Sequence, residues 1–189
     1  MNSYSIVVSD SNEESRKKIC TLLKKRGYKT YEALDGAETI RICRSTLPDL
    51  VIIDTGLRGM NSFEVAHIIE DNKISTVIFI TNNINDTFYK NLKDMNVFAY
   101  LMKPINLQQL YHTVEFSIMN SYKMSMLSKE IERLENTLEE RKIIAKAKGI
   151  LMNKLNISEE EAFKMLRTKS MNKCISMSSL CKIIIKKYG

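Results

Sequence analysis

The sequence predicts an α/β protein in which a doubly wound, five-stranded parallel sheet is followed by an all-α tail. Two observations lead to this fold class. Short runs of Val and Ile alternate with helical patterns through the first half of the chain, as is typical of a parallel sheet with helices on both faces. After Pro104 there is no further proline and no strand-like run, so the remainder is expected to be helical.

The strands of this sheet are expected where apolar runs are short and rich in Val and Ile. The strongest runs are at 5–9, 50–53 and 76–80, and weaker ones are at 28–32 and 97–102. Helical patterns lie between them, at 13–26, 37–44, 63–69 and 86–95. Functional residues of such a sheet sit just past the carboxyl ends of its strands. Here these positions carry Asp10, Asp54, Thr81 and Lys103.

An amphipathic stripe runs through the beginning of the tail. Met124, Leu127, Ile131, Leu134 and Leu138 are spaced by three and four residues in turn, which is the a/d pattern of a coiled coil. The pattern predicts an extended coiled-coil helix over residues 121–140 and a homodimer formed through it. Because a stripe of about two to three heptads is short, packing against its own chain is the alternative.

A small three-helix domain is expected over residues 141–189, with helices at 141–154, 159–168 and 176–187. Ser158 followed by Glu161 forms a capping box, in which the hydroxyl and the carboxylate satisfy backbone amides of the first turn. This capping box predicts where the middle helix begins. Asn172 is expected to help end that helix.

Charge is distributed unevenly along the chain. Residues 1–120 hold 14 basic and 14 acidic residues, residues 121–140 hold 3 and 5, and residues 141–189 hold 12 and 3. The C-terminal segment therefore has a net charge of +9, within a chain of net charge +7. Clustered Lys and Arg gain affinity for polyanions by releasing phosphate counterions. A polyanionic partner is favoured, and a merely solvated surface is the alternative.

Other features argue against several classes of protein. The four cysteines form no CxxC pair, and His67 and His112, the two histidines, are far apart. The chain lacks a Gly-rich phosphate loop, a nucleophile elbow and a metal-binding histidine pair, so an enzyme is not expected. No apolar run approaches the roughly 18 residues that span a bilayer. We therefore expect a cytoplasmic protein without a membrane partner.

Four spaced features of residues 1–120 carry a resemblance to a known domain. Asp54 closes the strand DLVIID, Thr81 closes TVIFIT, and Tyr100 and Lys103 lie in AYLMKP. In this order and spacing they resemble the receiver domain of two-component response regulators, which has a flavodoxin-like fold. The resemblance implies that Asp54 accepts a phosphoryl group from a sensor histidine kinase. It also implies phosphate-binding or switch roles for Thr81, Tyr100 and Lys103.

The same resemblance implies a Mg²⁺ site formed by Asp10, Asp54 and Gly56, and here the sequence departs from the family. Ser11 stands where the family has a second acid, Arg58 where it usually has proline, and Asn82 where it has a small residue. A neutral hydroxyl in place of a carboxylate weakens the binding of a hard cation. Two readings stay open: phosphorylation at Asp54, or a pseudo-receiver that no longer takes phosphate.

Two runs in residues 141–189 carry a second resemblance. AKAKGILM at 145–152 and SEEEAFKMLRTKSMN at 158–172 resemble the ANTAR module, an antitermination domain found at the C-terminus of many response regulators. The resemblance implies binding to paired RNA stem-loops with six-nucleotide loops, so that transcription proceeds past a terminator. The alternative is a DNA-binding transcriptional regulator, because a basic helical domain after a receiver often has that role.

Particular residues of the tail are expected to contact the RNA. Contacts to phosphates or bases are expected from Lys146, Lys148 and Arg167, with a hydrogen bond from Ser170. Ala147 and Gly149 are expected to permit close approach, since Gly inside a helix costs about 1 kcal/mol relative to Ala. The apolar positions are expected in the core, namely Leu151, Met152, Phe163, Leu166 and Met171. The predicted organisation is thus a receiver over 1–120, a coiled-coil linker over 121–140 and an ANTAR domain over 141–189.

Overall fold

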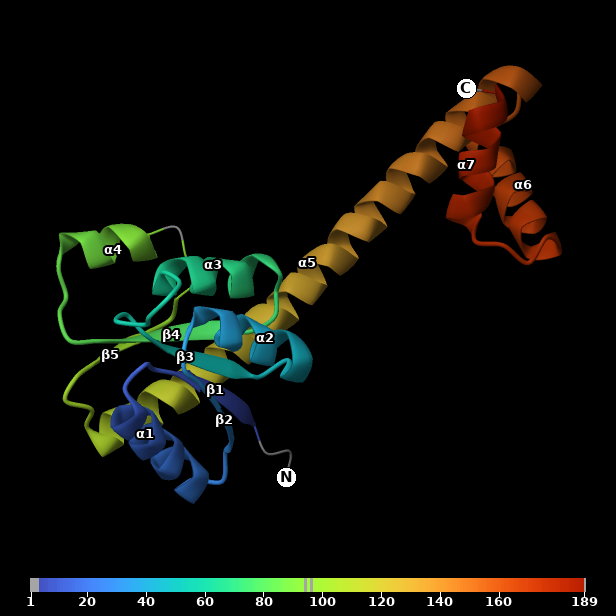
Figure 1. Ribbon diagram of the computed structural model, residues 1–189. Helices are drawn as coiled ribbons and strands as arrows, with labels where there is room; N and C mark the ends of the chain where they lie inside the picture. The colour runs from blue at the N-terminus through green and yellow to red at the C-terminus, as the bar shows by residue number, and fades with distance from the viewer. Residues whose placement is uncertain (1–3, 94, 96, 189) are drawn as a thin grey trace. The chain divides into compact units, whose positions relative to one another are not determined.

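The structure is a computed structural model that describes residues 4–93, 95 and 97–188. Its sheet has five parallel strands in the order β2-β1-β3-β4-β5 (Figure 1). The strands are β1 (Ser5–Ser9), β2 (Lys29–Ala33), β3 (Leu50–Asp54), β4 (Thr76–Thr81) and β5 (Tyr100–Met102). The doubly wound parallel sheet predicted from the sequence is confirmed.

Helices cover both faces of this sheet, and successive residues of each strand point to opposite faces. Ile6 and Val8 face a core with α1 (Glu13–Lys25) and the start of α5 (Leu107–Leu155). Val7 faces the opposite core, with α2 (Gly36–Thr46), α3 (Ser62–Asp71) and α4 (Asp86–Leu92). All three side chains are fully buried, which explains the continuous Val and Ile runs of the central strands.

Polar residues just after the strands begin the helices. Asn12, Asp35, Asn61 and Asn85 are the N-caps of α1, α2, α3 and α4, and each side chain accepts a hydrogen bond from a backbone N–H of the first turn. Such a cap satisfies an amide that has no partner within the helix. The same loops therefore fix the helix starts and present polar groups at the carboxyl edge of the sheet.

The weaker elements are shorter than, or shifted from, their predicted ranges. Strand β5 pairs with β4 only at Tyr100, Leu101 and Met102, so the strand predicted over 97–102 was too long. Helix α4 ends at Leu92 instead of 95, because the Met95 N–H bonds to the Leu92 carbonyl and closes a turn there. Asp94, which falls in that predicted helix, lies outside the described residues.

The chain divides into two compact units, Met1–Met124 and Ser125–Gly189. The second contains the end of α5, helix α6 (Glu159–Asn172) and helix α7 (Met177–Tyr188), which share a core of their own. The separate helices predicted over 121–140 and 141–154 are a single element, because nothing in the sequence breaks α5 before Leu155. The middle helix also runs past 168 to Asn172.

The predicted capping box of α6 is confirmed. The Glu161 N–H donates to the Ser158 hydroxyl over 3.2 Å, and the Ser158 N–H donates to the Glu161 carboxylate over 2.8 Å. These bonds lower the pKa of Glu161. Asn156, with φ of 51°, adopts the left-handed conformation that ends α5 just before. The turn between α5 and α6 is therefore specified by local chemistry on both sides.

The stripe on α5 is exposed to solvent. Met124, Leu127, Ile131, Leu134 and Leu138 are each 45–58% exposed. Among the described residues of each unit, no segment of the same unit covers this stripe, so the alternative of packing against its own unit is not seen. Among the described residues, no helix is both long and apolar enough to cross a membrane, because α5 is polar around most of its surface.

Three of the four cysteines are core residues. Cys20, Cys43 and Cys181 are buried, whereas Cys174 is exposed, and all four thiols are free. Burial raises the pKa of Cys20 to about 11 and that of Cys43 to about 12. These two thiols are protonated at neutral pH and fill space as small apolar groups.

Candidate functional site

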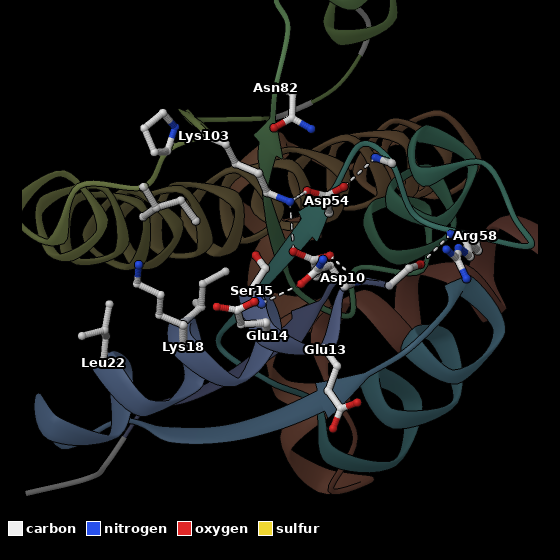
Figure 2. A pocket seen from close by; sticks show the side chains of 16 residues that line it. Asp10, Glu13, Glu14, Ser15, Lys18, Leu22, Asp54, Arg58, Asn82 and Lys103 are labelled. Atoms are coloured by element: carbon white, nitrogen blue, oxygen red, sulfur yellow. Dashed lines mark hydrogen bonds and ion pairs between the residues drawn. The ribbon is translucent and has the colours of Figure 1, made fainter.

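Three charged residues meet at the carboxyl edge of the sheet. Asp10 follows β1, Asp54 ends β3 and Lys103 follows β5. The Lys103 ammonium lies 3.1 Å from Asp10 Oδ2 and also forms an ion pair with Asp54 Oδ2. Figure 2 shows the lysine side chain pointing toward both carboxylates. Asp10 and Asp54 are only 2% and 5% exposed, so the lysine is the cation shared by two buried acids.

The remaining carboxylate oxygens bind backbone amides. Asp10 Oδ1 accepts from the Asn12 N–H over 2.8 Å, and Asp54 Oδ1 accepts from the Gly56 N–H over 2.7 Å. A Cβ at position 56 would lie 2.9 Å from Asp54 Oδ1, which is closer than ordinary contacts. Glycine at this position therefore lets the backbone hold the Asp54 carboxylate in place.

The two carboxylates of this triad change the pKa of Lys103. Burial alone would lower that pKa, but the hydrogen bonds to Asp54 and Asp10 outweigh it, and the pKa is raised. A raised lysine pKa means that the stability it provides is present below pH 10.5 and is lost as the pH rises through the folded-state value. The ion pairs are therefore intact throughout the neutral range.

An open cavity of about 720 Å³ lies over the triad, with Asp10, Asp54, Gly56 and Lys103 in its lining. Two other predicted site residues do not line it. The Thr81 hydroxyl donates to the Asn83 carbonyl over 2.8 Å and accepts from Thr55 over 3.0 Å. The Tyr100 hydroxyl lies 3.2 Å from that of Tyr89, a contact that raises the pKa of Tyr100.

Ser11 joins three loops at the edge of the cavity. Its hydroxyl donates to the Leu34 carbonyl over 3.1 Å and accepts from the Arg58 N–H over 2.8 Å. Ser11 thereby ties the loop after β1 to those after β2 and β3. Arg58 and Asn82 also line the cavity, and Figure 2 draws Arg58 at its side, away from Asp10 and Asp54.

The ligand atoms available at this site are of the type that binds a hard divalent cation. Carboxylate and carbonyl oxygens are the ligands that Mg²⁺ prefers, and Asp10, Asp54 and the Gly56 carbonyl could provide them. Their number is small, however, since the described part of the chain contains no group of three or more His, Cys, Asp or Glu side chains able to hold a metal. A cation here also competes with Lys103 for both carboxylates.

Arg16 is a buried residue of the site that the sequence analysis did not identify. Its guanidinium donates to the Asp10 carbonyl over 2.7 Å and to the Glu32 carboxylate over 3.2 Å, and the residue is 4% exposed. A buried arginine needs such partners, so Arg16 fixes the backbone that carries Asp10. Lys18 and Glu14 of α1 line the cavity as well. The spacing of Glu14 and Lys18 along the helix did not indicate that their side chains would line this cavity.

The predicted RNA-contact residues of the C-terminal unit separate into accessible and buried positions. Lys146 and Arg167 are exposed, and Lys148 forms an ion pair with Glu159. In contrast, Ala147 is fully buried and Ser170 is 6% exposed, with its hydroxyl donating to the Arg167 carbonyl. Both side chains are covered by their own unit, so Lys146 and Arg167 are the accessible residues among the predicted contacts.

The predicted core positions of α5 and α6 also divide differently from the prediction. Leu151 and Leu166 belong to the core of this unit. Phe163 and Met171, which were predicted in the core, are 42% and 66% exposed. The row of small or branched residues Ala162, Leu166 and Ser170 is buried instead, because positions four apart on a helix share a face.

Gly149 has open space beside it. A Cβ built at this position meets no atom within 4 Å, so close packing of the described chain does not require glycine here. The surface of α5 at Gly149 is therefore open to the close approach that was expected from the sequence.

Comparisons with known proteins cover both units. The family model described as the response regulator receiver domain matches residues 6–115, more than half of the chain. The model described as the ANTAR domain matches residues 132–185. The chain is 25% identical over 185 residues to the transcriptional regulatory protein PdtaR of Mycobacterium tuberculosis, covering 97% of this chain and 90% of that protein.

Two further similar proteins match only part of this chain. Protein PilH of Pseudomonas aeruginosa is 26% identical over 112 residues, covering 58% of this chain and 93% of that protein. The crystal structure of the signal receiver domain of a modulated diguanylate cyclase from Desulfovibrio desulfuricans is similar with a TM-score of 0.61. That match has 22% identity and covers 65% of this chain and 99% of the other, so it bears on the fold alone.

Proposed function

Since the chain belongs to the response regulators, with a receiver domain and a C-terminal ANTAR domain, we propose that it binds RNA stem-loops and thereby causes transcription antitermination. It is a regulator of the ANTAR type and not an enzyme. The observation that carries the proposal is the ANTAR match over residues 132–185, in the part of the chain with a net charge of +9 over residues 141–189. Lys146, Lys148 and Arg167 are its proposed RNA contacts.

Two of the proposed RNA contacts are exposed side chains, and the third is a lysine that must first leave a surface ion pair. Lys146 and Arg167 are exposed, whereas Lys148 must exchange Glu159 for a phosphate. Such an exchange is inexpensive, because surface ion pairs contribute only about 0–1 kcal/mol. Unstacked loop bases are accessible to side chains, and the open face at Gly149 lets an RNA backbone approach α5 closely.

Pairing of two chains is the second part of the proposal. The exposed stripe on α5 is apolar at Leu127, Ile131 and Leu134, and residues at such a and d positions form the seam of a coiled coil. Two ANTAR domains held together can bind two hairpins of one RNA. Tethering raises the affinity without any new contact.

The test of both parts compares one-hairpin and two-hairpin RNAs whose six-nucleotide loops are randomised, with duplex DNA as competitor. We expect the two-hairpin RNA to bind at least about 100-fold more tightly than the single hairpin, since linked sites commonly gain that much. Ile131→Glu is expected to abolish this gain and leave single-hairpin binding unchanged. Fluorescence anisotropy measures the affinities, and light scattering measures the mass.

The control for that test is Asn136→Glu, which adds the same charge at an exposed position of α5 outside the stripe. It is expected to behave like the parent protein. Stronger binding to duplex DNA than to any hairpin would sink the RNA proposal in favour of a DNA-binding regulator. An unchanged gain in Ile131→Glu would refute pairing through the stripe.

Control by phosphorylation at Asp54 is the third part of the proposal. The Asp54 carboxylate is held by the Gly56 amide and by Lys103 at the floor of an open cavity. One of its oxygens would form a bond to phosphorus as the bond from phosphorus to the kinase histidine breaks. Lys103 would then neutralise charge on the transferred group. Thr81 and Tyr100 are its proposed switch residues, each needing to move to reach the cavity.

Mg²⁺ belongs to this third part as a weakly bound cofactor. Asp10, Asp54 and the Gly56 carbonyl would hold it, and the bound cation would offset the negative charge of the incoming group. Asp10 and Asp54 would be its two carboxylate ligands, since the Ser11 hydroxyl is already hydrogen-bonded to Leu34 and Arg58. The proposed site is therefore weaker than one with a third carboxylate.

Incubation with acetyl phosphate and Mg²⁺ tests this part of the proposal. We expect the parent protein to gain one phosphoryl group by intact mass and Asp54→Asn to gain none, because an amide is not a nucleophile under these conditions. Asp86→Asn, an exposed position at the start of α4, is expected to react like the parent. A parent protein that takes up no phosphoryl group would leave the pseudo-receiver as the correct reading.

A further inference from the structure

A groove between α5 and α7 of the C-terminal unit is lined by four lysines. It encloses about 380 Å³, with Lys142 and Lys146 on α5 and Lys182 and Lys186 on α7. The two lysines of each helix are four residues apart, so they lie on one face of that helix. Ile143 and Ile185 are half-buried between the two rows, and Glu139 lies at one end.

These lysines have no acidic partner within the described part of the chain, where the ion pairs formed join other residues. Lys148 in the same unit is paired with Glu159, whereas among the described residues no ion pair offsets the charge of the four groove lysines. Like charges four apart on a helix destabilise it, and the two rows repel each other across the groove. Glu139 offsets one charge of the four, so the groove keeps a net charge of +3.

The chemistry of the lining selects among anionic partners. Lysine ammonium groups bind phosphate as mobile point charges. The lining contains no aromatic side chain and no amide or hydroxyl group that could read a base edge. A groove of this kind holds a sugar–phosphate backbone and does not distinguish sequences. The predicted contacts Lys148 and Arg167 lie outside this groove.

We propose that this groove binds the phosphate backbone of the hairpin stem, while the loop is contacted elsewhere on the unit. The proposal rests on the proposed RNA-binding function and adds Lys142, Lys182 and Lys186 as contacts. Only Lys146 among the four was expected from the sequence. The groove supplies affinity that depends on salt and is common to all stems, because each phosphate contact releases counterions.

The experiment uses the full chain with Lys182 and Lys186 both replaced by Gln. Binding to hairpins with a randomised six-nucleotide loop is measured between 50 and 200 mM salt, a range over which phosphate contacts are resolved. We expect affinity at the lower salt to fall about tenfold or more. The slope of log K against log salt is expected to fall by roughly 2, since each phosphate contact contributes about 0.9. Circular dichroism checks that the helices are intact.

The matched control replaces Lys164 and Lys169 of α6 by Gln, which removes the same charge from exposed positions outside the groove. It is expected to keep the slope of the parent protein. An equal loss in both double variants would overturn the proposal, because the effect would then follow net charge alone. An unchanged slope in Lys182→Gln/Lys186→Gln would overturn it as well.

Two further outcomes separate this proposal from its alternatives. If the groove variant keeps its RNA affinity but loses binding to a poly-glutamate peptide, the groove belongs to an acidic protein segment and the proposal is overturned. If the parent protein itself binds no hairpin, the RNA-binding function fails and the groove proposal fails with it. Hairpin binding by the parent, with a reduced slope only in the groove variant, supports both.

Discussion

Leu166→Ala is expected to unfold the C-terminal unit under conditions in which the parent protein is folded. Leu166 is fully buried and central to the small core that also contains Ala147, Ala162 and Leu180. Truncating a buried leucine costs about 2–5 kcal/mol through lost transfer energy and a residual cavity. A unit of this size rarely has more than about 3–5 kcal/mol of stability. The loss therefore removes most of it, together with hairpin binding.

Thermal unfolding followed by circular dichroism at 222 nm measures this effect. We expect the low-temperature helical signal of Leu166→Ala to be reduced, because α6 and α7 depend on that core. Phe163→Ala is the control, three residues away on the same helix but 42% exposed, and it is expected to change stability by no more than about 0.5 kcal/mol. Equal effects of the two substitutions would contradict the assignment of the buried face of α6.

Lys103→Met is expected to destabilise the receiver by about 3–5 kcal/mol at neutral pH, the usual consequence of removing one partner of a buried ion pair. Asp10 and Asp54 would remain buried without their shared cation. Two buried like charges without a counter-charge repel each other. Protonation of either carboxylate removes that repulsion, so part of the lost stability is recovered as the pH falls.

The pH dependence is therefore diagnostic of this second substitution. Urea unfolding at pH 5.5, 7.5 and 9 should show that the deficit of Lys103→Met shrinks toward low pH. The parent protein should not show this trend, since its raised Lys103 pKa keeps both ion pairs intact below pH 10.5. Lys18→Met, a lysine of the same cavity without an ion pair, is the control. A deficit independent of pH would argue that packing and not charge explains the effect.

The sheet and the charged triad could be predicted because each leaves a mark in local sequence. Strands buried on both faces require unbroken apolar runs such as residues 50–53 of β3. The parallel arrangement then brings the residues after those strands to one edge. Asp10, Asp54 and Lys103 are therefore neighbours although 93 positions separate the first and the last.

The role of Ser11 could not be predicted in the same way. The sequence showed only that an acid is missing, whereas the hydroxyl joins Leu34 and Arg58 from two other loops. Those contacts depend on the spatial arrangement of three loops, and no local pattern encodes it. The same holds for the lysine groove, whose two rows come from helices about forty residues apart in the chain.

The buried face of α6 could not be identified from the sequence, for a different reason. Ala162, Leu166 and Ser170 form one row with a four-residue spacing, and Phe163, Arg167 and Met171 form the next row. Both rows contain apolar residues, so periodicity supports either as the buried one. The sequence prediction placed Phe163 and Met171 in the core together with Leu166, but only the row of Leu166 packs in the core that α6 shares with α5 and α7. Packing space, which is a tertiary property, determined the outcome.

Helix α5 spans Leu107–Leu155, and its residues 123–136 are all exposed. In an unpaired chain, that stretch is held helical by its own backbone hydrogen bonds and by pairs such as Glu130 with Arg133. Isolated helical segments of this length are marginal in water. The connection between the two units is then a helix–coil equilibrium. Because the proposed pairing would bind only the helical state, protein concentration would set how stiffly one unit is coupled to the other.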